Sequence, residues 1–278
     1  MKFTLPQGRP AVMGILNVTP DSFSDGGNYM SAPEALAAAR RMMQEGADLI
    51  DVGAESTRPG SKPVLEDEER SRLDLIIPRL QAEGIPFSID TMKPALARFA
   101  ISHGACLVND VSGLRQPQMI EAVAGSDCQV CIMHMQGLPA DMQNSPAYPG
   151  DDVVGTVCEY LEGQSQLAIA GGIAKERIWL DPGIGFGKTD AHNLSLIKAA
   201  AKIVQLGYPV LYGVSRKGVV GRVLSDEPGS MVPIPQRLPG SLACQVYAQL
   251  CGVRIIRTHD VRETRAAIRM TQAILGSP

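Results

Sequence analysis

Short runs of apolar residues alternate along the chain with longer stretches in which apolar residues recur at helical spacing. Apolar runs of this kind are typical of strands buried in a parallel sheet, and the amphipathic stretches are typical of helices that cover it. Eight runs occur, about thirty residues apart, and eight βα units favour a closed (β/α)8 TIM barrel over an open sheet. The runs are Val12 to Val18, Leu49 to Val52, Pro86 to Asp90, Leu107 to Val111, Val130 to Met135, Ile178 to Asp181, Val210 to Val214 and Val253 to Thr258.

The stretches between these runs predict the helices. The clearest are Pro33 to Glu45, Glu66 to Glu83, Pro94 to His103 and Val261 to Ile274. Ser225 to Pro239 is rich in proline and predicts an irregular loop, either an active-site element or an exposed spacer, with Pro239 starting the next helix. No linker or low-complexity tract divides the chain, so residues 1–278 are predicted to form a single domain.

Composition narrows the class of function. The formal net charge is −3 and the pI is about 5.8, without the clustered basic excess of a nucleic-acid-binding protein. No uninterrupted apolar stretch reaches the roughly eighteen residues of a membrane span, and the first ten residues lack the apolar segment of a secretory signal. We therefore expect a cytoplasmic protein that acts on small molecules and binds neither nucleic acid nor membrane.

Six cysteines are too few for a disulfide framework in a chain of this length. Cys128 and Cys131 have the spacing of a redox or zinc pair, but they lie in a predicted strand, where residues three apart point to opposite faces. Cys244 and Cys251 are seven apart on a predicted helix and face the same way. The sequence therefore favours reduced core cysteines over a metal or redox site.

Polar residues end almost every apolar run. In a barrel of this type the carboxyl ends of the strands form the active-site rim, so these residues are the first candidates for function. Each alone could simply cap the following helix. Carboxylates, amides and cations around one mouth favour a binding site for the set. The residues are Asn17, Asp51, Asp90, Asn109, Asp110, His134, Asp181, Ser215, Arg216, Lys217, Arg257 and His259.

The residue types indicate the ligand. A carboxylate accepts two parallel N–H bonds, and an amide both donates and accepts, which suits the amino-pyrimidinone edge of a flat heterocycle. Lys217 could donate to a ring oxygen or nitrogen of that heterocycle. Arg257 and His259 follow the eighth strand, near the usual phosphate site of barrels, and their charge suits a diphosphate. For Arg257, a salt bridge with a neighbouring carboxylate is the alternative.

The glycine-rich segment from Gly183 to Thr189 fits neither nucleotide-binding pattern. A P-loop would require glycine at Pro182, and the spacing also fails the dinucleotide fingerprint. The glycines are expected instead to allow close backbone approach to a flat ligand beside Phe186.

Eight ordered segments, spread from about Val12 to about Ile274, resemble those of the dihydropteroate synthase family. The first two are Gly14-Ile-Leu-Asn-Val-Thr-Pro-Asp-Ser-Phe-Ser-Asp-Gly-Gly27 and Asp51-Val-Gly-Ala-Glu-Ser-Thr-Arg-Pro-Gly60. The others are Ser88-Ile-Asp-Thr91, Val108-Asn-Asp-Val111, Met133-His-Met-Gln-Gly137, Asp181-Pro-Gly-Ile-Gly-Phe-Gly-Lys188, Ser215-Arg-Lys217 and Arg257-Thr-His-Asp260. The resemblance implies condensation of (7,8-dihydropterin-6-yl)methyl diphosphate with p-aminobenzoate, giving 7,8-dihydropteroate and diphosphate in folate biosynthesis.

The same resemblance implies a role for individual residues. The pterin is expected to be bound by Asp90, Asn109, Met133, Asp181, Phe186 and Lys217. The diphosphate is expected to contact Asn17, Thr57, Arg257 and His259, with Asn17 also a ligand of Mg²⁺. The p-aminobenzoate is expected beside Phe23, Thr57, Pro59, Arg216 and Gly218. Asn17, Lys217, Arg257 and His259 are expected to carry the chemistry.

Diphosphate is a good leaving group once Mg²⁺ and cations neutralise it, and the pterin ring can donate electron density to the methylene carbon, which favours an SN1-like displacement. The neutral amine of p-aminobenzoate needs no strong base, which fits the absence of an obvious nucleophile and base pair. The first two loops are expected to close over the second substrate. One position departs from the family. A serine commonly follows the Ser-Arg-Lys triplet and helps to bind p-aminobenzoate, whereas this chain has Gly218. Affinity for p-aminobenzoate, and for the sulfonamides that imitate it, therefore remains open, because a backbone N–H at a helix start can still bind an anion.

Two other functions remain as alternatives. A corrinoid methyltransferase would share the pterin-binding residues but would have no diphosphate to bind, and a non-catalytic pterin-binding barrel would not need Arg257 and His259. Release of diphosphate distinguishes the predicted reaction from both. The family commonly forms homodimers, and apolar faces on Leu242 to Leu250 and Ala266 to Ile274 would permit one, although they would equally suit a monomer.

Overall fold

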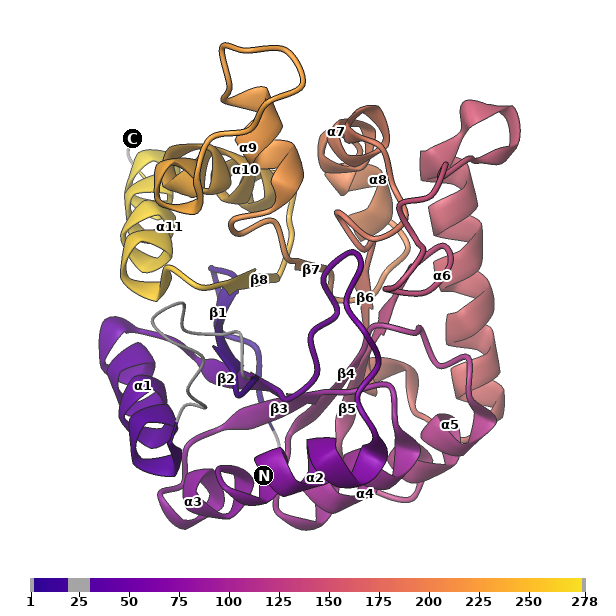
Figure 1. Cartoon of the computed structure of the whole chain (residues 1–278), viewed down its shortest axis with the longest axis vertical. Helices are drawn as coiled ribbons and strands as arrows, with labels where there is room; N and C mark the ends of the chain where they lie inside the picture. The colour runs from indigo at the N-terminus through magenta and orange to yellow at the C-terminus, as the bar shows by residue number, and fades with distance from the viewer. Residues whose placement is uncertain (1–2, 20–30, 277–278) are drawn as a thin grey trace.

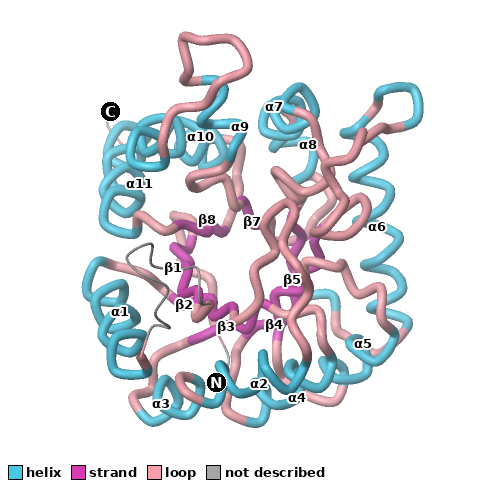
Figure 2. The backbone as a smooth tube through the Cα atoms, in the orientation of Figure 1, coloured by secondary structure: helices cyan, strands magenta, loops and turns pink. Residues whose placement is uncertain are grey.

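The computed structural model describes residues 3–19 and 31–276. Eight parallel strands lie in the order β6-β5-β4-β3-β2-β1-β8-β7, and a bridge between Leu180 and Val210 brings the two edge strands together. The predicted (β/α)8 barrel is therefore confirmed, with helices around the strands (Figures 1 and 2). The strands are β1 (Ala11–Asn17), β2 (Leu49–Gly53), β3 (Phe87–Asp90), β4 (Leu107–Asp110), β5 (Gln129–Met133), β6 (Ile178–Asp181), β7 (Leu211–Tyr212) and β8 (Ile255–Thr258).

The helices lie close to their predicted positions with one exception. The stretch from Glu66 to Glu83 forms two helices instead of one, because Pro78 lacks an N–H and is tolerated only in a first helical turn. Pro239 lies in the first turn of α10, as predicted. The helices are α1 (Ala32–Glu45), α2 (Glu66–Asp74), α3 (Ile77–Ala82), α4 (Pro94–Ser102), α5 (Pro117–Ala124), α6 (Val153–Ala170), α7 (Asp190–Lys198), α8 (Ala200–Val204), α9 (Gly218–Val223), α10 (Leu238–Leu250) and α11 (Val261–Leu275).

Alternation along the strands produces two apolar layers. Met13 and Trp179 belong to the cluster inside the barrel, whereas Val12 belongs to the larger cluster between strands and helices. Cys131 lies in the inner cluster and Cys128 in the outer one, which confirms that the two cysteines face opposite sides. Both layers are filled, so the barrel has a packed core.

None of the described helices is long and apolar enough to cross a membrane. The segment from Ser225 to Pro239 contains a short 3-10 turn, Ile234–Arg237, which leads into α10.

Candidate active site

An arginine from β8 joins carboxylates from β2 and β3 at the mouth of the barrel. Arg257 Nε donates to Asp51 Oδ2 at 2.6 Å, and its Nη2 donates to Asp90 Oδ2 at 2.8 Å. Asp51 is fully buried and also accepts from Ser88 Oγ at 2.5 Å and from Asn109 Nδ2 at 3.1 Å. The salt-bridge alternative for Arg257 is therefore correct, and its charge is already paired before any diphosphate arrives.

Two buried acceptor atoms of this network have no hydrogen-bond partner among the residues that the structure describes. They are Asp90 Oδ1 and Asn109 Oδ1. Asn109 turns its amide nitrogen toward the Asp51 carboxyl group, so its carbonyl oxygen stays free. A buried acceptor without a partner costs about 1–3 kcal/mol, which a ligand with N–H donors would recover. The site is thus complementary to a ligand rich in hydrogen-bond donors.

Burial shifts the titration of the charged groups around the mouth. It raises the pKa of Asp90 to about 7, although the nearby Arg257 charge opposes the change. It raises the pKa of Asp181 to about 6, against the opposing hydrogen bond from Gly183 N–H. Burial, reinforced by the Arg257 charge, lowers the pKa of Lys217 to about 8. All three shifts disfavour charge, as expected for a pocket with little water.

An aromatic ring and a cation lie together between the loops that follow β6 and β7. Lys217 Nζ is 4.1 Å from the centroid of the Phe186 ring. Phe186 and Met133 belong to a small buried cluster at this end of the barrel. A ring, a thioether and an ammonium group can together contact the face and the edge of a flat ligand.

The glycines of the β6–α7 loop do allow a close approach, but to protein. A Cβ on Gly183, whose φ is +69°, would lie 1.9 Å from the backbone oxygen of His134. A Cβ on Gly185 would lie 3.2 Å from Lys217 Cδ. These glycines pack the loop against the β5 end and against Lys217, and their expected approach to a flat ligand beside Phe186 stays a prediction.

Two polar residues that end strands serve the structure of the loops. His134 Nδ1 lies 2.9 Å from Lys188 Nζ, which also donates to Phe186 O at 3.0 Å. Asp110 accepts from the backbone N–H of Ser112 and of Leu114 at 2.8 and 2.9 Å. For His134 and Asp110, a structural role analogous to capping is therefore the correct interpretation.

His259 lies beside Ser215, with 3.1 Å between His259 Nδ1 and Ser215 Oγ. Burial lowers the pKa of His259 to about 3, helped by the positive charges of Arg216 and Arg257. The sequence predicted a charged His259 beside the diphosphate. In the structure it is a neutral imidazole near pH 7, so it offers a hydrogen bond and not a charge.

Arg216 and Gly218 flank Lys217 at the start of α9. Arg216 adopts a left-handed backbone conformation with φ of 60°, and its guanidinium forms a bidentate pair with Asp260. A Cβ on Gly218 would lie 2.9 Å from Arg222 Nη1, so the Arg222 side chain fills the space that a serine there would need. The Arg216 guanidinium is therefore already paired with Asp260 when an anion binds.

The other predicted contacts come from the first two βα loops. Asn17 ends β1, and its Oδ1 lies 3.5 Å from the position of a Cβ on Gly53, at the end of β2. Thr57 is half-buried and Pro59 is exposed in the β2–α2 loop. Phe23 lies outside the described residues.

Within residues 3–19 and 31–276, no group of three or more His, Cys, Asp or Glu side chains could hold a metal ion. The described residues therefore do not form a metal site from their own side chains alone.

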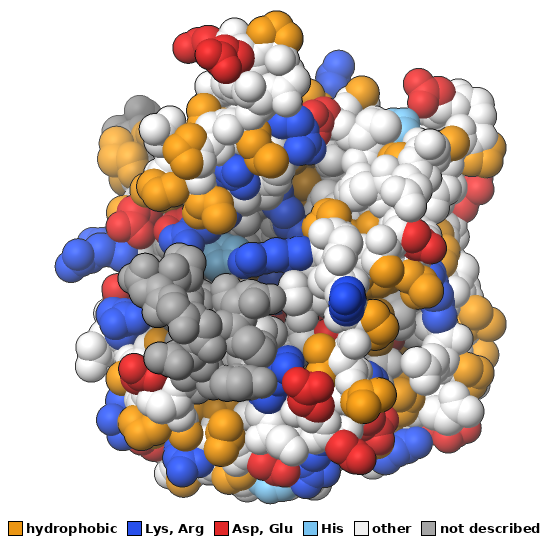
Figure 3. Space-filling view, in the orientation of Figure 1, with side chains coloured by type: hydrophobic (Ala, Val, Ile, Leu, Met, Phe, Trp, Pro, Cys, Tyr) orange, Lys and Arg blue, Asp and Glu red, His pale blue; other side chains and the backbone are white. Residues whose placement is uncertain are grey.

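Figure 3 shows Lys, Arg and His side chains gathered over the middle of the face that carries the strand ends. This arrangement favours an anionic group at the mouth.

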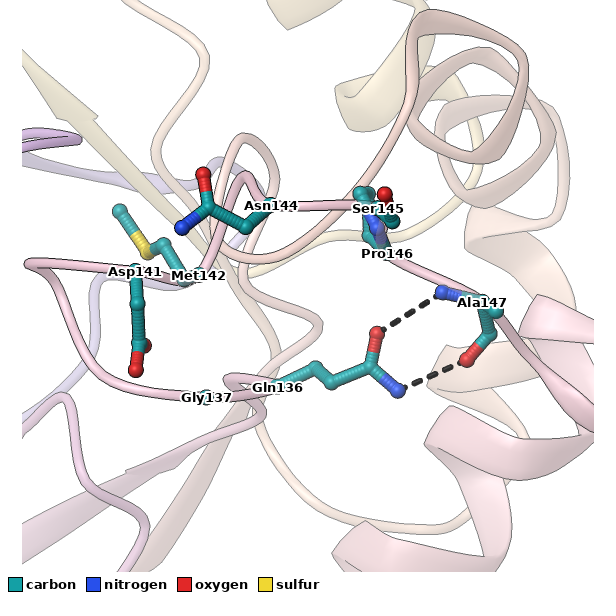
Figure 4. Close-up of a pocket in the computed structure, with 8 residues that line it drawn as sticks. All are labelled: Gln136, Gly137, Asp141, Met142, Asn144, Ser145, Pro146 and Ala147. Atoms are coloured by element: carbon teal, nitrogen blue, oxygen red, sulfur yellow. Dashed lines mark hydrogen bonds between the residues drawn. The ribbon is translucent and has the colours of Figure 1, made fainter.

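A separate pocket lies within the β5–α6 loop. Gln136 spans it and exchanges hydrogen bonds with the backbone of Ala147 (Figure 4). Its lining comes only from residues 136–147, and none of the strand-end carboxylates contributes to it. We therefore place the candidate active site at the strand ends.

Sequence reasoning missed the ion pairs beneath the β2–α2 loop. Lys93 lies between Glu55 and Glu69, and the Glu69 side chain is fully buried. Glu55 and Lys93 follow the ends of β2 and β3 by two and three residues, which was the available signal. Ser88, which donates to Asp51 inside the barrel, was quoted only as part of a motif.

The comparison with known proteins agrees with this geometry. Residues 13–259 match the pterin binding enzyme family. The dihydropteroate synthase of Escherichia coli (strain K12) is 45% identical over 278 residues, which cover 99% of this chain and 95% of that protein. That of Neisseria meningitidis serogroup C is 40% identical, with 98% and 95% coverage.

Solved structures are equally similar. The dihydropteroate synthase of Yersinia pestis, in complex with a sulfonamide drug, superimposes with a TM-score of 0.90 at 43% identity, covering 99% of this chain and 97% of that one. The enzyme of Xanthomonas albilineans with 4-aminobenzoic acid has a TM-score of 0.89 at 43% identity, with 98% and 95% coverage. The chain therefore belongs to the pterin binding enzyme family and, within it, to the dihydropteroate synthases, which are transferases of folate biosynthesis.

Proposed function

We propose that the chain condenses (7,8-dihydropterin-6-yl)methyl diphosphate with p-aminobenzoate to give 7,8-dihydropteroate and diphosphate. The observation that carries this proposal is the pair of buried, unpartnered acceptors, Asp90 Oδ1 and Asn109 Oδ1. A reduced pterin presents several N–H donors along one edge and a carbonyl oxygen that Lys217 can bind. Asp181 supplies a further carboxylate, and Met133 and Phe186 contact the faces of the ring.

The reaction follows an SN1-like path. The bond between the methylene carbon and the diphosphate oxygen breaks, and the diphosphate leaves with the electron pair. The positive charge spreads into the pterin ring, next to the acceptors of Asp90 and Asn109. The amine of p-aminobenzoate, neutral at pH 7, then forms the new C–N bond and loses a proton. Positioning and electrostatics supply the catalysis, because the described mouth offers no paired nucleophile and base.

Arg257 and His259 bind the leaving diphosphate in this scheme. Arg257 shares its charge with Asp51 and Asp90, so its guanidinium is held in place before the substrate binds. His259 donates a hydrogen bond, and a diphosphate beside it would raise its depressed pKa. Thr57 adds a hydroxyl from the β2–α2 loop.

Mg²⁺ fits the donor set here only with the help of the substrate. Asn17 offers one amide oxygen at the end of β1, and Mg²⁺ is commonly bound by one or two protein oxygens together with phosphates and waters. When bound, the ion would neutralise the diphosphate and make it a better leaving group.

The second substrate lies between the β2–α2 loop and the start of α9, near Thr57, Pro59, Arg216 and Gly218, and the predicted contact with Phe23 concerns a residue outside the described ones. Gly218 offers no hydroxyl, so its backbone N–H and Arg216 are left to bind the carboxylate of p-aminobenzoate. Sulfonamides would compete for the same place.

The decisive experiment incubates the protein with both substrates, with and without Mg²⁺, and measures diphosphate and dihydropteroate together. Equal amounts of both products, dependent on the metal, are expected. Tight pterin binding without either product would favour the methyltransferase or the non-catalytic alternative and would contradict the proposal.

We further propose that the enzyme acts in the cytoplasm as a homodimer. Exposed apolar side chains on α10 and α11 support a second copy at this face: Tyr247, Leu250, Met270, Ile274 and Leu275. Light scattering on a Leu250→Glu, Met270→Glu variant is expected to show a monomer, and an unchanged dimer would place the interface elsewhere.

A further inference from the structure

The two ends of the β2–α2 loop (residues 54–65) are joined by one carboxylate. Glu55 Oε1 accepts from Val64 N–H at 2.9 Å, and Glu55 Oε2 accepts from Lys93 Nζ at 2.6 Å. The Glu55 side chain is 7% exposed. Because residues 55 and 64 are the first and last parts of the loop, this pair of bonds closes its stem.

The stem is anchored on both neighbouring elements. Lys93, just after β3, also pairs with Glu69 of α2, and Glu69 Oε1 accepts from Thr91 Oγ1 at 2.9 Å. The Glu69 side chain is 0% exposed, and burial raises its pKa in spite of the Lys93 charge. A buried carboxylate of this kind is tolerated only while its partners are in place, so the arrangement favours one position of the stem.

The loop leads from this stem to the mouth. Figure 1 shows it as the purple segment that rises from β2 across the ring of strands before it turns down to α2. Near its tip, Gly60 N–H donates to Pro139 O of the β5–α6 loop at 2.9 Å. Arg58 lies close enough to the site that its charge contributes, after burial and other charges, to the lowered pKa of Lys217 and of His259. The described loop therefore covers part of the strand-end site.

We propose that Glu55 is a positioning residue for the second substrate, because it binds Val64 N–H and Lys93 at once and so holds residues 57–59 over the mouth. The inference rests on the proposed function, in which Thr57 and Pro59 contact the diphosphate and p-aminobenzoate. The pterin-binding groups belong to strand ends and to the β6–α7 and β7–α9 loops. Opening the stem thus weakens binding of p-aminobenzoate and leaves binding of the pterin ring intact.

The test uses Glu55→Ala, which removes both bonds, and Glu55→Gln, which keeps an oxygen for Val64 N–H but loses the charge that pairs with Lys93. The KM for p-aminobenzoate is expected to rise about tenfold in Glu55→Ala, the effect of losing a charged hydrogen bond, and less in Glu55→Gln. The Kd for 6-hydroxymethyl-7,8-dihydropterin, measured by calorimetry, is expected to stay within about twofold of wild type.

Glu83→Ala is the matched control. This variant also removes a carboxylate that is paired with a basic side chain, here Arg40. Glu83, however, lies at the end of α3, before β3 begins. Glu83→Ala is expected to leave the KM for p-aminobenzoate and the Kd for 6-hydroxymethyl-7,8-dihydropterin unchanged. An unchanged KM for p-aminobenzoate in Glu55→Ala would overturn the inference, and so would a parallel rise in KM and pterin Kd with a lower Tm, because that pattern indicates a purely structural role.

A second readout separates this inference from the reaction itself. In hydrogen–deuterium exchange, the peptide that contains Val64 is expected to exchange faster in Glu55→Ala than in wild type or in Glu83→Ala. A wild-type protein that makes no dihydropteroate would refute the proposed function. Unchanged exchange at Val64 would refute the stem itself, whatever the activity.

Discussion

Replacing Lys217 by methionine should stabilise the fold while it weakens substrate binding. The pocket lowers the pKa of Lys217 from its ordinary value of 10.5 to about 8, first by burial and then through the Arg257 charge. A shift of this size corresponds to about 3 kcal/mol against the ammonium form. Methionine keeps an apolar contact with Phe186 and needs no hydration. We expect the free energy of unfolding to rise by about 1–3 kcal/mol at pH 7. The gain does not exceed this because the neighbouring carboxylates lose a counter-charge, which opposes it.

The pH dependence gives the sign of this effect. An unfolded lysine stays protonated up to about pH 10.5, whereas the folded Lys217 loses its proton near pH 8. Between these values the unfolded chain binds more protons, so wild-type stability rises with pH. The stability advantage of Lys217→Met should therefore be largest below pH 8 and should disappear by about pH 10.5.

Binding should change in the opposite direction. The lost donor leaves the ligand carbonyl unpaired, which costs about 1–3 kcal/mol, or a five- to 150-fold rise in the pterin Kd. Thermal or urea unfolding measures the first effect, and calorimetric titration with 6-hydroxymethyl-7,8-dihydropterin measures the second. A variant that is less stable at pH 7 would contradict the cost assigned to burying the Lys217 charge. A variant that binds the pterin with wild-type affinity would show that Lys217 does not contact the ligand.

Three further outcomes follow from the structure. Asp181→Asn should weaken pterin binding by about 1–3 kcal/mol, and wild-type affinity would show that Asp181 does not contact the pterin. Gly183→Ala should lower the free energy of unfolding by about 3 kcal/mol, because its Cβ would lie 1.9 Å from His134 O. Gly60→Ala, whose Cβ would have no atom within 4 Å, should lower it by only about 1 kcal/mol. Equal Tm values for the two variants would contradict this difference. Chelation of Mg²⁺ should abolish turnover but leave binding of 6-hydroxymethyl-7,8-dihydropterin unchanged, and persistent turnover would exclude a metal requirement.

The barrel was largely predictable because most strands are short, mainly apolar runs with a polar residue in or just after their last positions. The run from Ile178 to Asp181 matches β6 at both ends. The seventh run, Val210 to Val214, is longer than β7, because only Leu211 and Tyr212 keep regular pairing beside the junction with β6. The split between α2 and α3 depends on one proline and was missed for that reason.

The site was predictable as a set of residues but not as a network. Sequence position places Asp51, Asp90 and Arg257 in the last half of their strands, yet it does not show which carboxylate the arginine joins, since that depends on side-chain reach across the mouth. The neutral state of His259 depends on burial, which the sequence does not display. His134 and Asp110 also end strands, and only their hydrogen-bond partners reveal that they stabilise loops.

The bond between Arg257 and Asp51 spans 206 positions of the chain. During synthesis, the carboxylates of β2 and β3 are made long before the arginine that neutralises them. Until β8 is added beside β1, both acids lack their counter-charge in a forming apolar barrel, which disfavours their burial. A chain that stops before residue 257 would thus lack more than one substrate contact. It would also lack the charge that allows Asp51 and Asp90 to be buried, so competence to bind a pterin arises only when the last strand has docked.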